Sequence, residues 1–244
     1  MLLPTRWLRS LVLIGFASSL VGCTENGVSL FIQGVPRPDP EGACVVDPDP
    51  GGTFYLDGKL DKLFRPAGDY TRSVLIGNQM QPRGDADTLR PETSQVQFYE
   101  AEVTVFDVEG NQLLSYTHPT SGFVYQATGI DPSYGTAQVT MIPPEVSSVF
   151  DTSGGQGHRV VSRVRVFGTT IGGTEVSTGN WDWPIFLCET SIDPNFDCIG
   201  GYNPEDAEAE CPLMCKPGQD EPIDIRYFPG GCCRDDTPAC ESDG

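Results

Sequence analysis

Apolar and polar residues alternate along much of the chain between residues 28 and 188, as in strands that bury one face. The clearest alternation lies in segment 159–167, where three valines share one face of the predicted strand and three arginines share the other. These residues are Val160, Val164, Val166, Arg159, Arg163 and Arg165. Similar runs predict strands at 28–33, 53–56, 73–77, 96–108, 112–117, 123–128, 137–142, 159–170 and 175–187.

Segment 96–108 changes phase within its length. Its apolar residues fall on one parity up to Phe98 and on the other from Ala101. One extra residue in a strand produces such a change, so the pattern predicts a β-bulge or a bend between Tyr99 and Ala101. The following Glu109-Gly110-Asn111 is typical of a tight turn and predicts a hairpin.

Many short strands separated by Gly, Pro and Asp turns indicate a mainly β fold. We expect residues 28–188 to form an antiparallel β-sandwich with immunoglobulin-like architecture. The Cys–Trp–Cys arrangement of true immunoglobulin domains is missing, so the expectation concerns the layers alone. Trp181 and Trp183 share a strand face; they are expected in the core, although paired Trp rings on a sheet surface can also bind sugars.

The amino-acid composition changes after Cys188. Residues 189–244 hold seven Pro, fourteen acidic and three basic residues, and they lack long apolar runs. Such a segment buries little core, so we expect a small, loop-rich C-terminal region stapled by disulfides.

The first 22 residues have the three parts of a secretory signal. Arg6 and Arg9 supply positive charge, and the apolar stretch 11–20 is too short to span a bilayer. The signal ends in Leu20-Val21-Gly22-Cys23, which resembles the lipobox of bacterial lipoproteins. The resemblance implies cleavage before Cys23 and acylation of that cysteine with chains such as palmitate. Residues 23–27 would be a lipidated tether.

The residue after Cys23 also carries information. By the same resemblance, Thr24 is not the Asp that retains such proteins in the inner membrane, so an outer-membrane location is expected. The apolar run at 28–33 leaves only a short tether, which places the domain close to the bilayer.

Charge excludes one class of partner. The whole chain has 15 basic and 34 acidic residues; without Arg6 and Arg9, 13 basic residues remain and the net charge is −21. Nucleic acid is excluded as a partner, because neutralising phosphates requires many Lys and Arg side chains. The expected partners are membrane lipid, through acylated Cys23, and an envelope protein.

The nine cysteines fit an exported protein. Lipidation removes Cys23 and leaves an even set, as expected of disulfides in an oxidising compartment. The predicted disulfide cysteines are Cys44, Cys188, Cys198, Cys211, Cys215, Cys232, Cys233 and Cys240. A Cys44–Cys188 bond would clamp the two ends of the β-domain. Zinc is the rival interpretation, but the chain's two histidines, His118 and His158, lie far upstream of Cys211 and Cys215.

The sequence predicts no catalytic residue, no metal site and no cofactor. His118, Ser121 and Asp131 match no hydrolase pattern. Oxygen-bearing side chains two residues apart resemble calcium ligands at Asp47 and Asp49, at Asp85 and Asp87, and at Asp193, Asn195 and Asp197, but the last set lacks the Gly and Glu of an EF-hand loop. We therefore expect a structural or interaction protein of the envelope rather than an enzyme. The alternative is a carbohydrate-binding or calcium-dependent module.

Overall fold

The computed structural model describes residues 29–39, 44–62, 68–84, 91–150, 157–189 and 219–220. These residues form ten strands and one short helix. The elements are β1 (Leu30–Pro36), β2 (Phe54–Tyr55), β3 (Gly58–Asp61), β4 (Tyr70–Asn78), β5 (Val96–Asp107), β6 (Gln112–Val124), β7 (Ser133–Ile142), α1 (Pro144–Ser147), β8 (His158–Thr170), β9 (Glu175–Ser177) and β10 (Trp181–Cys188).

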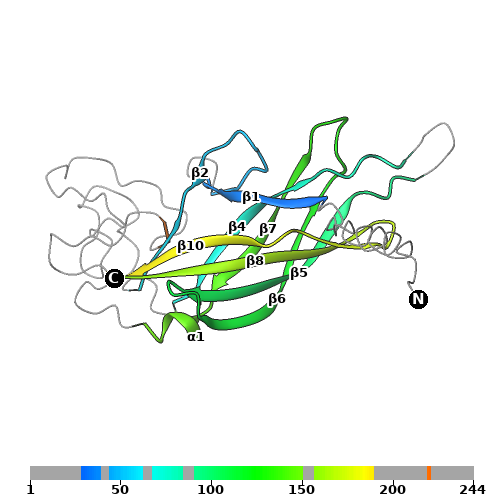
Figure 1. Cartoon of the computed structure of the whole chain (residues 1–244). Coiled ribbons are helices and arrows are strands. Elements are labelled where there is room, and N and C mark those ends of the chain that lie inside the picture. The colour runs from blue at the N-terminus through cyan, green and yellow to red at the C-terminus, as the bar shows by residue number, and fades with distance from the viewer. Residues whose placement is uncertain are drawn as a thin grey trace, which may run out of the picture.

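The strands form two sheets, which Figure 1 shows as neighbouring layers. One sheet has the order β2-β1-β4-β7, and the other has the order β3-β10-β8-β5-β6 with β9 also paired to β8. The mainly β prediction is confirmed. The prediction of wholly antiparallel sheets is wrong, because β3 runs parallel to β10. Parallel strands cannot be joined by a tight hairpin, and β3 and β10 are accordingly far apart in the sequence.

Both sheets contribute to one hydrophobic core. Its members include Ile32, Val74 and Val139 from the first sheet and Val103 and Val164 from the second. The alternation predicted for β8 is confirmed: its valines at 160, 164 and 166 are buried and its arginines at 159, 163 and 165 are exposed. Side-chain parity therefore fixes which face of this strand meets solvent.

Two local predictions are also confirmed. The register of β5 shifts between Phe98 and Glu100 against both β6 and β8, at the predicted bulge. Residues 108–111 join β5 to β6 in a hairpin, in which the Gly110 N–H donates to the Asp107 carbonyl oxygen over 3.1 Å. Gly110 has φ +85°, a conformation that favours glycine.

Two predicted boundaries are wrong. Segment 112–117 and the first two residues of segment 123–128 belong to one strand, β6, which ends at Val124. Its continuity is hidden in the sequence because residues 118–122 hold no large apolar side chain. Segment 175–187 instead divides into β9 and β10. The break occurs at Thr178, whose hydroxyl accepts a hydrogen bond from the Val166 N–H over 3.0 Å. The Thr178 hydroxyl thus takes the place of a backbone carbonyl as the acceptor for the Val166 N–H.

The two sheets meet where β6 approaches β7. The Tyr116 hydroxyl donates to the Thr140 carbonyl oxygen over 2.5 Å, and the Thr140 N–H donates to His118 Nε2 over 3.2 Å. A Cβ atom at Gly122 would overlap the carbonyl oxygen of Thr136. Glycine is therefore required for this close approach of two backbones.

Candidate functional site

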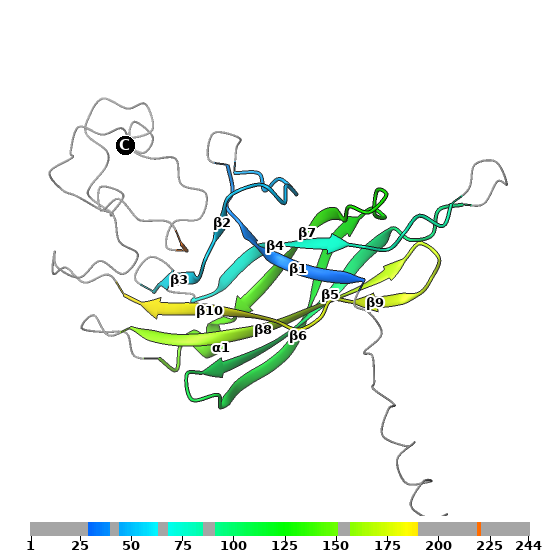
Figure 2. The ribbon, with the colours of Figure 1, turned by 45° about the horizontal axis from the view of Figure 1, so that its top comes forward.

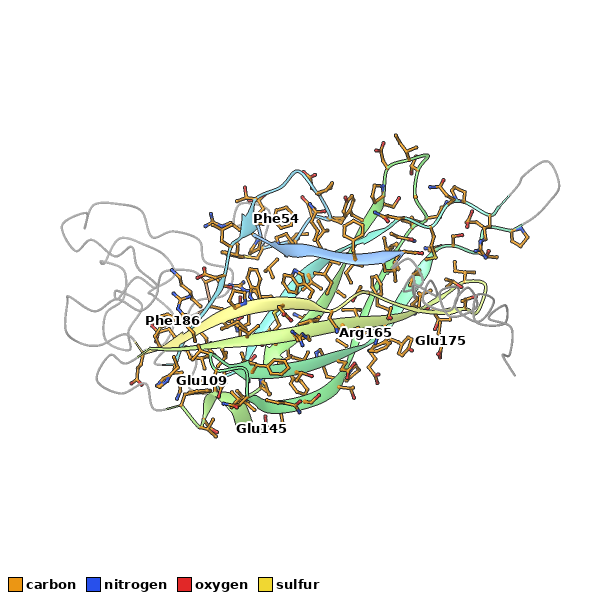
Figure 3. All side chains as sticks on the ribbon, in the orientation of Figure 1. Phe54, Glu109, Glu145, Arg165, Glu175 and Phe186 are labelled. Atoms are coloured by element: carbon orange, nitrogen blue, oxygen red, sulfur yellow. The ribbon has the colours of Figure 1, made fainter. Side chains whose placement is uncertain are left out.

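The outer face of the six-stranded sheet carries a row of arginines on β8. We name it the arginine row; it comprises Arg159, Arg163 and Arg165. Each guanidinium lies over an aromatic ring, at 5.1 to 5.4 Å from the ring centre. The pairs are Arg159 with Phe186, Arg163 with Phe106 and Arg165 with Phe167. Figure 3 shows Arg165 along β8 and Phe186 towards the end of β10.

Polar partners fix two of these side chains. Arg163 donates two hydrogen bonds to the Asp182 carboxylate, over 2.7 and 2.8 Å. Hydrogen bonding and then charge from Arg163 lower the pKa of Asp182 against the effect of desolvation. Arg165 donates to the Ser177 hydroxyl over 2.8 Å from one nitrogen. The row is therefore held in a defined position on the sheet.

The row can bind carboxylates. Among the described residues, neither Arg159 nor Arg165 forms an ion pair with an acidic side chain. A guanidinium presents its N–H donors in a planar fork that matches a carboxylate, and stacking on a ring leaves the edge of that fork available. The row thus presents ordered guanidinium groups on this face, where Asp182 neutralises Arg163 and Glu102 lies opposite Arg165 in the β5–β8 register.

A second cluster is buried between the core and residues 219–220. Arg72 Nε lies 2.7 Å from Asp220 Oδ2, and their side chains are 3% and 2% exposed. The Tyr70 hydroxyl donates to the same carboxylate oxygen over 2.6 Å, and the Lys59 N–H donates to the other oxygen. Arg72 also donates to the Gln219 carbonyl oxygen. We name this set the Arg72–Asp220 clasp.

Burial dominates the electrostatics of the clasp. Desolvation, followed by the charge of Asp220, raises the pKa of the Tyr70 hydroxyl well above its usual value, so this group stays a donor. Desolvation opposes the charge on Arg72, but the neighbouring Asp220, Tyr70 and Tyr55 outweigh it and raise the pKa of Arg72. Burial raises the pKa of Asp220 against the lowering effect of Arg72. The guanidinium therefore remains charged and needs its acidic partner.

The clasp ties residues 219–220 to β3 and to the start of β4, one strand from each sheet. The Gln219 side-chain nitrogen donates to the Asp69 carbonyl oxygen over 3.0 Å, and the Asp220 N–H donates to the Lys59 carbonyl oxygen over 3.0 Å. This contact was not predicted from the sequence, although the sequence holds a signal for it. Arg72 shares the parity of Val74 and Ile76, and an arginine on a core-facing position implies a buried acceptor.

The tryptophan pair lies beside the clasp. Trp183 is 5% exposed and donates to the Tyr70 hydroxyl over 3.3 Å. The Trp181 ring stacks on it with the centres 5.1 Å apart and is partly buried against the core. The core interpretation is confirmed for Trp183, and Trp181 lies at its margin.

The structure describes two of the predicted cysteines. Cys44 and Cys188 are both disulfide-bonded, and the bond between them stays a prediction. Cys23 and the cysteines at 198, 211, 215, 232, 233 and 240 lie outside the described residues, as do the acidic residues at 85–87 and 193–197. Asp49 accepts a hydrogen bond from the Gly51 N–H over 2.8 Å, which caps a turn. His158 packs against Phe150 with ring centres 5.1 Å apart.

In the described part of the chain, no group of three or more His, Cys, Asp or Glu side chains is placed to bind a metal ion. The one helix described there, α1, has four residues, and no helix among those residues could cross a bilayer. No protein-family model and no curated protein matches the chain.

Proposed function

We propose that the chain is an exported lipoprotein of the cell envelope, anchored by acylated Cys23 to the outer membrane, and that it acts by binding an envelope protein rather than by catalysis. The motif Leu20-Val21-Gly22-Cys23 supports the anchor. The start of β1 at Leu30 supports a short tether, because this strand begins seven positions after Cys23.

The arginine row is the observation that carries the binding role. It places three of the chain's 15 basic residues on one strand face, beside aromatic rings. Arginine and aromatic side chains are enriched in protein interfaces, whereas an isolated surface charge would not need such ordered neighbours. The partner surface that fits is acidic, because carboxylates complement the two guanidinium groups at Arg159 and Arg165.

We extend the proposal to the architecture. The two sheets would form a β-sandwich of immunoglobulin-like type, supported by the single core to which both contribute. The C-terminal region would be stapled by disulfides, supported by the bonded state of Cys44 and Cys188 and by the clasp at Asp220.

The test is crosslinking in the native envelope with a photoreactive residue at Thr104. This residue pairs with Arg163 across β5 and β8, and its hydroxyl lies 2.9 Å from that of Ser115 on the outer face. We expect a discrete crosslinked partner with the parent protein. The double change Arg159→Gln and Arg165→Gln should abolish that product by removing both guanidinium groups, and glutamine avoids a like charge opposite Glu102.

A matched control keeps this test specific. Arg37 is exposed and follows β1 of the other sheet, so Arg37→Gln removes a charge without touching the row. The control should retain the crosslink, and both variants should keep the parent's thermal midpoint. The same crosslink in all three proteins would overturn the binding role of the row.

A further inference from the structure

One end of the molecule exposes a group of large apolar side chains. Their exposed fractions are 51% for Phe123, 55% for Tyr125, 95% for Ile130 and 62% for Ile171. They come from the end of β6, the β6–β7 connection and the β8–β9 turn. The rings of Phe123 and Tyr125 meet edge to face at 5.1 Å, and Phe123 and Ile171 line a common pocket. We name these four residues the apolar end.

The described chain begins at this same end. The Ser29 carbonyl oxygen accepts a hydrogen bond from the Gln79 N–H over 2.8 Å, and Leu30 pairs with Asn78. The Asn78 side chain in turn donates to the carbonyl oxygen of Tyr125 over 2.8 Å. Figure 2 shows the start of β1 on the side of the β8–β9 turn.

Further hydrogen bonds hold the backbone next to these apolar side chains. The Ile171 N–H donates to the Gln95 carbonyl oxygen over 2.9 Å. The Glu92 carboxylate accepts four backbone N–H groups, which holds residues 83–84 beside residues 92–94; they belong to Arg83, Gly84, Thr93 and Ser94. The apolar side chains therefore project from an ordered base.

Tether length decides which end can meet the membrane. Six residue steps separate Cys23 from Ser29, and an extended chain spans at most about 3.5 Å per step, or roughly 20 Å. Strand β8 has 13 residues and spans about 40 Å at roughly 3.3 Å per residue. A lipid on Cys23 can therefore lie beside the apolar end, whereas the opposite end stays out of its reach.

We infer that the apolar end inserts its exposed side chains into the surface of the bilayer that holds the lipid anchor. This inference rests on the proposed acylation of Cys23. Aromatic side chains favour the membrane–water interface, and a contact of this kind reinforces an acyl anchor. The contact would be apolar rather than electrostatic, because Glu175 lies at the same end (Figure 3).

The orientation has a consequence for the arginine row. Strand β8 runs along the length of its sheet (Figure 1), so the line of three arginines would run along the membrane normal. The arginine side chains would then not lie against the lipid. Glu109 and Glu145 lie at the opposite end (Figure 3), which would face away from the bilayer. A partner could then reach the row from the side.

Depth-dependent quenching tests the inference on the acylated protein in phospholipid vesicles with brominated acyl chains. The reporter is Ile171→Trp, and the matched control is Val149→Trp, at a residue that is 70% exposed beside α1 at the far end. Emission from Trp181 and Trp183 is subtracted using the parent protein. We expect quenching at least threefold stronger for Ile171→Trp than for Val149→Trp.

Flotation of the same vesicles separates the two proposals. Protein that floats, with no more quenching of Ile171→Trp than of Val149→Trp, overturns the membrane contact alone. Protein that does not float overturns the anchor and the contact with it. A Cys23→Ala variant that floats as well as the parent overturns the anchor alone. Equal thermal midpoints for both tryptophan variants exclude misfolding as the cause.

Discussion

Arg72 and Asp220 form a buried ion pair although 147 residues lie between them in the sequence: Nε and Oδ2 are 2.7 Å apart, and both side chains are nearly inaccessible. We predict that Arg72→Ala lowers the free energy of unfolding by about 3–5 kcal/mol, because a buried carboxylate loses its counter-charge. Urea unfolding followed by circular dichroism measures the change.

Arg163 provides the control for this prediction. It pairs with Asp182 at the same distance, but their side chains are 44% and 48% exposed. Solvent screens such a pair, so Arg163→Ala should cost about 1 kcal/mol or less. Equal losses in the two variants would show that the clasp is not a buried ion pair.

Gly122 permits the close approach of β6 to β7. Alanine there would force its Cβ into the Thr136 carbonyl oxygen, and we expect a loss of about 1–3 kcal/mol in unfolding free energy from overpacking. The neighbouring Ser121 is exposed, so Ser121→Ala should leave stability nearly unchanged. Thermal unfolding of both variants measures the difference; a tolerated Gly122→Ala would contradict the described contact.

Glu92 makes stability depend on pH. Desolvation acts to raise its pKa, but backbone hydrogen bonds from Gly84, Ser94 and Arg83 lower the pKa from 4.5 to about 2. The folded state therefore binds this proton more weakly than the unfolded state does. The stabilisation is complete above about pH 5 and is lost as pH falls towards 2.

The variant Glu92→Gln isolates this effect. The difference in unfolding free energy between parent and variant should be constant from pH 5 to 7 and should shrink between about pH 4.5 and 2. Urea titrations across that range measure it. A difference independent of pH would mean that the Glu92 carboxylate does not accept these bonds.

The disulfide prediction can be tested on the mature protein. Cys44 and Cys188 are bonded, and we predict that all eight cysteines other than Cys23 are. Alkylation should add no label before reduction and eight labels afterwards, as read from intact mass. Peptide mapping without reduction then decides whether Cys44 joins Cys188. Fewer than eight new labels would contradict the four-bond model.

Local patterns predicted local structure well. Alternating valine and arginine identified β8 and its two faces, and the phase change before Ala101 identified the bulge in β5. These features depend on neighbouring residues, so the sequence carries them directly. Strand β6 was divided because residues 118–122 hold no large apolar side chain and include Pro119 and Gly122, which resembles a loop.

Contacts between distant segments were not predictable in the same way. Strand β3 has four residues, too few for a periodic signal, and its parallel partner β10 lies more than 100 residues later. Asp220 is one of fourteen acidic residues in its region, and nothing nearby distinguishes it. Its partner Arg72 was the detectable half of the clasp, through its core-facing parity.

The chemical state of Cys23 tests the central claim most directly. Intact-mass analysis of the protein extracted from membranes should find a chain that begins at Cys23 and carries acyl groups on that residue, and Cys23→Ala should lack them. A chain that retains residues 1–22, or that begins at an unmodified Cys23, would contradict the account.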